Sequence, residues 1–153
     1  MNRETVRALC QLNTEFYERN AASFSQTRTA PWEGWRRCMA ACGFDDSDEA
    51  LGQSMDTQIA DSVLDIACGN LRFEAFLANT YPHVDWSFFA VDNCEPLVAS
   101  GQEDIAKKVH FTCEDIVSNL LDGLSAAEPA NTPAFAAATP FDLVVSFGFL
   151  HHI

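Results

Sequence analysis

Acidic side chains close three apolar stretches of this 153-residue chain, and this pattern predicts a binding site. Asp65, Asp92 and Asp115 each end or nearly end a run of residues suited to a buried strand. A carboxylate neutralises a cation, and its two oxygens accept hydrogen bonds from two neighbouring hydroxyls. If the three runs are parallel strands, their carboxyl ends meet at one edge of a sheet. We therefore expect the three carboxylates to face one ligand.

The first of these stretches passes directly from a predicted strand into a predicted helix. The predicted strand is the short apolar run with Val63, Leu64 and Ile66. The predicted helix has apolar residues at helical spacing, which are Leu71, Phe73, Phe76 and Leu77. The turn between them is rich in small residues, so the free N–H groups of the helix start can approach a ligand closely. An ordinary turn that binds nothing fits the same residues. A dinucleotide site is disfavoured, because G-x-G-x-x-G requires glycine where this chain has Ala67, Gly69 and Arg72.

The sequence VLDIACGN, residues 63–70, resembles motif I of the class I S-adenosylmethionine-dependent methyltransferases, whose usual form is V-L-D-x-G-C-G-x-G. The chain departs from this motif at Ala67 and Leu71, where the family has glycine. We expect the Leu71 side chain to narrow the space over the turn. The resemblance implies that the cofactor-binding residues of this stretch are Asp65, Ala67, Cys68, Gly69 and Asn70.

The two later acids fit the same resemblance. In the family, an acid at the end of the second strand accepts both ribose hydroxyls, and Asp92, with Asn93 beside it, corresponds to that position. The acid after the third strand meets the adenine amino group, and the next apolar residue lies on the adenine ring. These residues correspond to Asp115 and Ile116. The alternative for Asp92 is the N-cap of a predicted helix over residues 95–106.

Residues 3–24 carry apolar side chains at three- and four-residue steps, which predicts an amphipathic helix. A Pro-containing break and a short helix from Trp35 to Cys42 follow. The stretch FYERNAASFSQTRTAPW, residues 16–32, resembles the N-terminal segment of the tRNA wobble-uridine carboxymethyl methyltransferase-like subgroup. This resemblance implies that Tyr17, Phe24 and Arg28 lie near the cofactor. A helix that only covers the sheet is the alternative.

The end of the chain predicts a fourth strand and a candidate catalytic pair. An Ala- and Pro-rich connection precedes FDLVVSF, residues 141–147, and FDLVVSFGFLHHI resembles motif IV of the same family. The resemblance implies that Ser146 and Phe147 lie beside the sulfonium and methionine part of the cofactor. His151 and His152 would then face the substrate as candidate general bases. Two surface histidines without a chemical role are the alternative.

Together these elements predict an α/β fold, a Rossmann-like methyltransferase core with parallel strands in the order 3-2-1-4 and helices on both faces. We expect an N-terminal helical cap at residues 1–44, an acidic linker at 45–61 and the cofactor-binding half of the domain at 62–153. The family fold continues through further strands, so we expect its carboxyl half to be missing. The strand 141–147 would then be an exposed apolar edge through which the chain self-associates.

Charge and composition exclude several classes of partner. The net charge is −13, with +2 on residues 1–44 and −15 on the remainder. Such a body repels polyanions, so non-specific nucleic-acid binding is disfavoured, although the N-terminal arginines leave tRNA open as a partner. The six cysteines form no C-x-x-C pair, so we expect reduced thiols and no metal site. No apolar span long enough for a membrane helix is found, and we expect a cytoplasmic protein.

The resemblance implies an enzyme that transfers a methyl group from S-adenosylmethionine to an acceptor, either a small molecule or a tRNA base. Two other functions stay open. One is a non-catalytic module that binds the cofactor as a scaffold, and the other is a nucleotide-dependent oxidoreductase, which the missing glycines disfavour.

Overall fold

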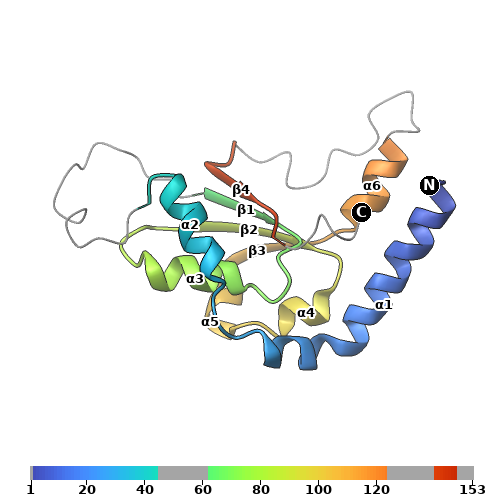
Figure 1. Ribbon diagram of the computed structural model, residues 1–153, viewed down its shortest axis with the longest axis horizontal. Coiled ribbons are helices and arrows are strands. Elements are labelled where there is room, and N and C mark those ends of the chain that lie inside the picture. The colour runs from blue at the N-terminus through green and yellow to red at the C-terminus, as the bar shows by residue number, and fades with distance from the viewer. Residues whose placement is uncertain (1, 45–61, 124–139, 148–153) are drawn as a thin grey trace.

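A four-stranded parallel sheet forms the centre of the molecule (Figure 1). The computed structural model describes residues 2–44, 62–123 and 140–147. Its strands are β1 (Ser62–Ile66), β2 (Ser87–Asp92), β3 (Val109–Cys113) and β4 (Leu143–Val145). They are ordered β3-β2-β1-β4, which confirms the predicted topology. The predicted linker at 45–61 and most of the Ala- and Pro-rich connection lie outside the described residues.

The helices largely follow the predicted positions, with different ends. They are α1 (Arg3–Thr27), α2 (Glu33–Ala41), α3 (Arg72–Thr80), α4 (Glu95–Ala99), α5 (Glu103–Ala106) and α6 (Ile116–Gly123). The long helix α1 begins after Asn2, whose side-chain oxygen accepts the Thr5 N–H at 2.8 Å. This is an N-cap, which satisfies a donor that the helix itself leaves free.

The prediction of one helix over residues 95–106 is wrong, because the chain breaks between α4 and α5. The break contains Gly101, whose backbone packs against the turn that follows β1. A side chain at Gly101 would place its Cβ 2.5 Å from the carbonyl oxygen of Asn70. Only glycine permits this approach. The interruption between α4 and α5 therefore lets the backbone pack against the turn after β1.

One face of the sheet carries the main core. Val63 of β1 and Phe88 of β2 pack there against aromatic side chains of α2 and α3, and the buried members of this cluster are Trp35, Met39, Phe44, Phe73, Phe76, Leu77 and Tyr81. A second cluster joins Leu71 and Ala75 to Val98 and Ile105. Helix α3 therefore lies between α2 on one side and the α4–α5 pair on the other.

Strand β4 is shorter than the predicted strand 141–147 and pairs with β1 alone in the described sheet. Before the strand begins, Asp142 instead accepts hydrogen bonds from the backbone N–H and the hydroxyl of Ser62, at 3.2 and 2.5 Å. This interaction fixes the start of β4 against β1. In the middle of the strand, the side chain of Val144 is 56% exposed.

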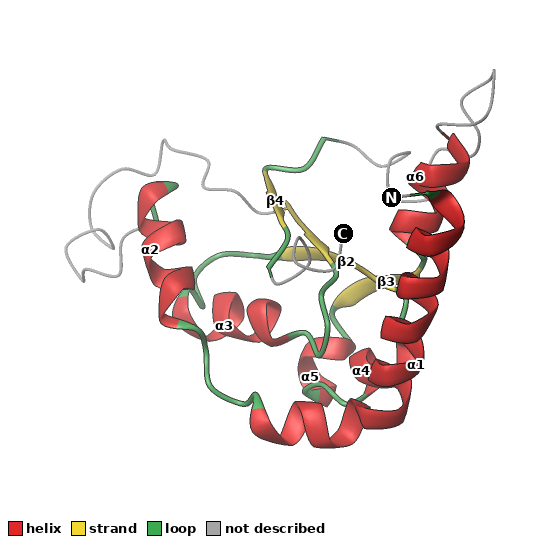
Figure 2. Cartoon of the chain, turned by 45° about the vertical axis from the view of Figure 1, so that its right-hand side comes forward, coloured by secondary structure: helices red, strands yellow, loops and turns green. Residues whose placement is uncertain are grey.

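Helix α1 lies across the carboxyl ends of β2 and β3, with α6 alongside it, as both views show (Figures 1 and 2). Thr14 accepts a hydrogen bond from the Asn93 side chain at 2.8 Å, which attaches α1 to the segment after β2. Ser25 pairs with Ser100 beyond α4. No helix in the described ranges is long and apolar enough to cross a membrane.

Candidate functional site

The turn from β1 to α3 alternates between ordinary and left-handed backbone conformations. The φ angle is 63° at Ala67, 60° at Gly69 and 58° at Leu71. Left-handed conformations favour glycine, because a Cβ crowds the following carbonyl. Ala67 and Leu71 are the two positions at which the chain departs from the glycines of motif I. The turn therefore keeps the geometry that those glycines allow, with added backbone strain.

The expectation that Leu71 narrows the space over the turn is wrong. Leu71 is 1% exposed, and its side chain packs with Ala75 and Val98 in the core beneath the turn. Its left-handed backbone directs the side chain to the sheet, so burial of an apolar residue offsets part of the strain. Leu71 is consequently absent from the wall of the cavity described below.

Asp92 organises the turn from the end of β2. Its Oδ2 accepts the Gly69 N–H and its Oδ1 accepts the Cys94 N–H, both at 2.9 Å. Cys94, and not Asp92, is the N-cap residue of α4. Burial raises the pKa of Asp92, and the backbone hydrogen bonds partly offset that rise. Each carboxylate oxygen keeps a further lone pair for a hydroxyl group.

A cavity of about 490 Å³ lies over this turn and along the carboxyl ends of the strands. Ligand pockets in proteins are commonly of this size. Of the residues that the sequence singled out, those lining the cavity are Tyr17, Phe24, Arg28, Asp65, Ala67, Cys68, Gly69, Asn70, Asp92, Asn93, Asp115, Ile116 and Phe147. Segments far apart in the chain therefore converge on one space, as parallel strands with a common carboxyl edge require.

Two buried acids, Asp65 and Glu74, lie at the junction of β1 and α3, and Asp65 also lines the cavity. Asp65 of β1 is 3% exposed, and Glu74 in the first turn of α3 is 1% exposed. Burial raises the pKa of Asp65 well above its ordinary range, and the Glu74 and Asp92 carboxyl groups raise it further. Burial also raises the pKa of Glu74 to about 7. Both acids therefore favour the protonated state.

The two acids lie within hydrogen-bonding reach of each other. With both ionised, Asp65 Oδ1 and both Glu74 oxygens have no donor among the described residues. One proton held between the carboxyl groups supplies that donor. Burial and the carboxyl groups of Glu74, Asp92 and Asp65 likewise raise the pKa of the Cys68 thiol, so this cysteine is a neutral part of the cavity wall.

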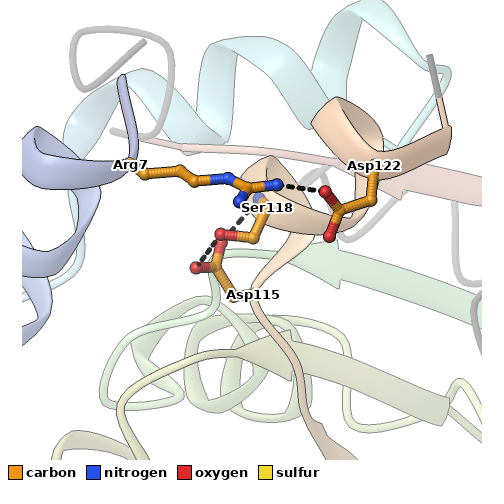
Figure 3. A network of polar contacts seen from close by, with 4 residues as sticks. All are labelled: Arg7, Asp115, Ser118 and Asp122. Atoms are coloured by element: carbon orange, nitrogen blue, oxygen red, sulfur yellow. Dashed lines mark hydrogen bonds and ion pairs between the residues drawn. The ribbon is translucent and has the colours of Figure 1, made fainter. Parts of the chain in front are cut away.

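Asp115 lies two residues beyond the end of β3 and has a structural role. Its carboxylate accepts the Ser118 backbone N–H at 3.0 Å and the Ser118 hydroxyl at 2.7 Å, and so caps the start of α6 (Figure 3). Neighbouring Glu114 also lines the cavity, and its Oε2 is buried without a partner among the described residues. The sequence reasoning missed Glu114, although it is the residue directly before Asp115.

Aromatic and cationic side chains of the N-terminal segment form another wall. Tyr17 and Phe24 meet edge to face, with ring centres 5.3 Å apart. The Arg28 guanidinium carbon lies 3.8 Å from the centre of the Phe24 ring. The backbone oxygen of Arg28 accepts a weak hydrogen bond from Asn70 at 3.4 Å, which connects this wall to the turn. Tyr17, Phe24 and Arg28, which the resemblance assigns to the cofactor, therefore line the same cavity as the turn.

Three of the sequence-based candidates, Ser146, His151 and His152, are not among the residues that line the cavity. Ser146 does not line the cavity, since its hydroxyl donates to the Ile66 carbonyl at 3.0 Å and joins the ends of β4 and β1. The candidate catalytic residues His151 and His152 lie outside the described residues. The structure adds wall residues to which the sequence analysis gave no site role, among them Cys10, Asn13, Thr14, Trp32, Trp35, Arg72, Phe73, Glu114 and Val117.

Comparison with known proteins gives no family assignment. No family model matches the chain, and no curated protein matches it. Crystal structures of the plantazolicin methyltransferase BpumL with SAH resemble it. The complex with a pentazolic desmethylPZN analog has a TM-score of 0.43 at 17% identity over 94% of this chain. The complex with a monoazolic analog has a TM-score of 0.45 at 17% identity over 93% of this chain.

The chain spans about half the length of these solved proteins, 49% and 48% of the two chains. Because both TM-scores lie below 0.5, the likeness supports no statement about function. The functional assignment that follows depends on the residues of this chain and on the motifs they form.

Proposed function

We propose that the cavity binds S-adenosylmethionine and that the chain forms the cofactor-binding part of a methyltransferase. The observation that carries this proposal is the convergence of Asp65, Asp92 and Asp115 from three successive strands on one cavity over a small-residue turn. The resemblance to motif I assigns a cofactor role to the same residues.

The cavity residues suit the groups of this cofactor. S-adenosylmethionine carries an ammonium and a sulfonium cation, and the acidic side chains Asp65 and Asp92 in the cavity wall favour a nearby cation. Asp92 accepts from the ribose hydroxyls through its remaining lone pairs. Ile116 offers an apolar surface to the adenine ring, and Asp115 an acceptor for the adenine amino group. Arg28 suits the carboxylate of the methionine part.

The chemistry itself belongs to the cofactor, whose sulfonium methyl group is already electrophilic. The protein has to hold the acceptor in line with that methyl group and exclude water. Phe147, at the carboxyl end of β4, places a π face near the sulfonium position. A cation next to Asp65 lowers the pKa of that carboxyl group, so binding is accompanied by release of the proton that Asp65 and Glu74 hold.

The acceptor is a small molecule or a tRNA base. The tRNA option rests on the resemblance of residues 16–32 to the wobble-uridine subgroup alone. The general base is assigned to His151 or His152, if the acceptor has to lose a proton before transfer.

A non-catalytic cofactor-binding module is the second candidate. It is favoured by the absence of His and Lys from the described wall of the cavity, which leaves that wall without an obvious base near neutral pH. A turnover assay separates this candidate from the enzyme, because both bind the cofactor and only one consumes it.

Isothermal titration of the 153-residue chain with S-adenosylmethionine, S-adenosylhomocysteine and NAD tests the proposal. We expect saturable binding of the two adenosyl ligands and none of NAD. Binding of NAD in preference to S-adenosylhomocysteine would support an oxidoreductase instead. Absence of binding for all three ligands would refute the cofactor assignment.

A further inference from the structure

Next to Phe147, the ring proposed to lie near the sulfonium, the cavity has two further aromatic residues that the cofactor groups do not explain. Trp32 and Trp35, before and within α2, line the cavity together with Phe147. The Phe147 ring centre lies 6.2 Å from that of Trp32 and 5.8 Å from that of Trp35, with the rings inclined to one another. Trp35 is 3% exposed and belongs to the core, whereas Trp32 is 56% exposed. Trp32 is therefore a cavity-lining ring that folding does not bury.

The Trp32 ring has a specific seat on the protein. Gly34 lies directly beneath it, since a Cβ at this position would come within 2.6 Å of two carbon atoms of the Trp32 ring. Glycine inside a helix is unfavourable, and Gly34 is the second residue of α2. The missing side chain lets the ring lie flat on the helix start. If the exposed Trp32 indole had no fixed position, glycine would not be needed at position 34.

Trp35 forms the fixed side of this aromatic end of the cavity. Its ring is part of the hydrophobic core, where it packs against Phe73 and Phe76 with ring centres 5.4 and 5.6 Å away. The Arg72 guanidinium lies 5.0 Å from the centre of the Trp35 ring and donates to the Ala30 carbonyl at 3.2 Å, which holds both in place.

The aromatic end, with Trp32, Trp35 and Phe147, is separated by the width of the sheet from the acidic end, where Asp92 and Asp115 lie. Ile116 follows β3 and Phe147 follows β4, and these strands lie at opposite sides of the sheet. Adjacent strands are about 4.8 Å apart, so the two ends of the cavity are separated by about 14 Å. If the adenosyl group occupies the β2–β3 side, the aromatic end lies beyond the cofactor, where an acceptor has to enter.

We infer that Trp32, Trp35 and Phe147 form the subsite for the methyl acceptor and that this acceptor is a planar aromatic or heteroaromatic ring. That the ring is a methyl acceptor rests on the proposed function. The ring packs against the exposed Trp32 ring and Phe147. Aromatic pairs gain stability beyond the area that they bury, which gives planar rings an advantage over saturated ones.

The test compares 2-naphthol with decahydro-2-naphthol, which has the same carbon skeleton and hydroxyl group but no aromatic ring. Binding is followed by the indole N–H signals of the ¹⁵N-labelled chain. We expect 2-naphthol to shift the signals of Trp32 and Trp35 and to bind roughly twofold to tenfold more tightly than the saturated alcohol. The Trp86 signal is an internal control, since its Nε1 already donates to the Tyr81 carbonyl at 3.2 Å. Equal affinity of the two alcohols, or equal shifts of all three signals, would overturn the inference.

Two variants distinguish binding at this subsite from nonspecific binding of 2-naphthol to the protein surface. Trp32→Leu should lose the preference for 2-naphthol, and Phe16→Leu should keep it, because Phe16 is also 56% exposed but does not line the cavity. Gly34→Ala should weaken 2-naphthol binding by displacing the Trp32 ring while leaving the thermal midpoint equal or higher. Unchanged binding in both Trp32→Leu and Gly34→Ala would refute the subsite.

The same samples are titrated with S-adenosylhomocysteine. If this ligand does not bind but the ring preference and its dependence on Trp32 are present, the cofactor proposal fails and the aromatic subsite stands as a ligand site. If this ligand binds without any ring preference, the cofactor proposal stands and the subsite fails.

Discussion

The two ends of the cavity are built from different interactions. At the β1–β3 end, carboxyl groups are fixed by hydrogen bonds, as Asp92 is by Gly69 and Cys94. At the β4 end, Trp32, Trp35 and Phe147 meet through ring contacts at inclined angles. Hydrogen-bonded charges specify the position of each ligand atom, whereas ring surfaces specify shape and tolerate variation. The acidic end therefore suits one invariant cofactor, and the aromatic end suits a class of acceptors.

Removing the Asp92 charge should have the largest effect on the acidic end. Asp92→Asn keeps one oxygen for the turn but loses the charge-assisted bonds to ribose, so we expect S-adenosylhomocysteine affinity to fall roughly tenfold to a hundredfold. Isothermal titration measures the change. Asp104→Asn, an exposed acid on α5, is the matched control. Equal affinities for the two variants would remove Asp92 from the site.

The buried acid pair should make stability depend on pH. Because burial raises the pKa of Glu74 to about 7, the folded chain holds a proton that the unfolded chain releases above its ordinary pKa of 4.5. The Glu74 contribution to stability should therefore fall as the pH rises from that value to about 7 and then level off, with a loss of about 3 kcal/mol. The raised pKa values of Asp65 and Asp92 act in the same direction.

Urea unfolding of Glu74→Gln tests this dependence. The amide is neutral at every pH and can donate to Asp65, so we expect the variant to be more stable than the parent by about 3 kcal/mol at about pH 8, with a flatter pH profile. Glu95→Gln, an exposed acid on α4, is the control. A parent chain whose stability rises with pH across this window would contradict the assignment of a buried proton.

Strain in the turn should be measurable as a smaller change. Ala67 holds a φ of 63° without a buried side chain to compensate, so Ala67→Gly should stabilise the fold by about 1 kcal/mol. Leu71→Gly is the informative contrast, because it relieves the same strain but removes a fully buried side chain, and it should destabilise. Chemical unfolding of both variants measures the difference, and a loss of stability in Ala67→Gly would show that the turn is not strained.

The surface contact between α1 and α6 should matter least. Arg7 pairs with Asp122 across these helices (Figure 3), and both side chains are more than half exposed, at 54% and 59%. Exposed ion pairs contribute at most about 1 kcal/mol, so Arg7→Gln should change stability by less than that. It should leave 2-naphthol binding at the aromatic end unchanged. A large loss of stability in Arg7→Gln would mean that α1 depends on this pair.

Much of the acidic end was predictable because its residues follow strands in order. The positions of Asp65 and Asp92 and the small-residue turn followed from apolar runs closed by polar residues, whereas the strand order followed from the resemblance to the methyltransferase family. The direction of the Leu71 side chain could not be predicted from the sequence, because it depends on the left-handed backbone conformation at this residue. The break at Gly101 was also missed, since it depends on contact with Asn70, more than thirty residues away.

The aromatic end was barely predictable. Trp32 and Trp35 lie at a helix start that the periodicity placed too late, and their meeting with Phe147 depends on tertiary contacts across more than a hundred residues. Glu74 was also invisible to sequence reasoning, because a glutamate in the first turn of a helix is usually exposed. Gly34 gave no signal in the sequence, because the predicted helix began one residue later, at Trp35, and the contact of Gly34 with the Trp32 ring is visible only in the structure.

Intermolecular nuclear Overhauser effects between S-adenosylhomocysteine and the labelled chain test the central claim most directly, because they give the direction of the ligand along the sheet. We predict contacts from the adenine protons to the Ile116 methyl groups and from the homocysteine methylene protons to the Ala67 methyl group, with none from adenine to Trp32. Adenine contacts to Trp32 or Phe147 in place of Ile116 would contradict the assignment of the two ends, and the acidic end would then not be the nucleoside site.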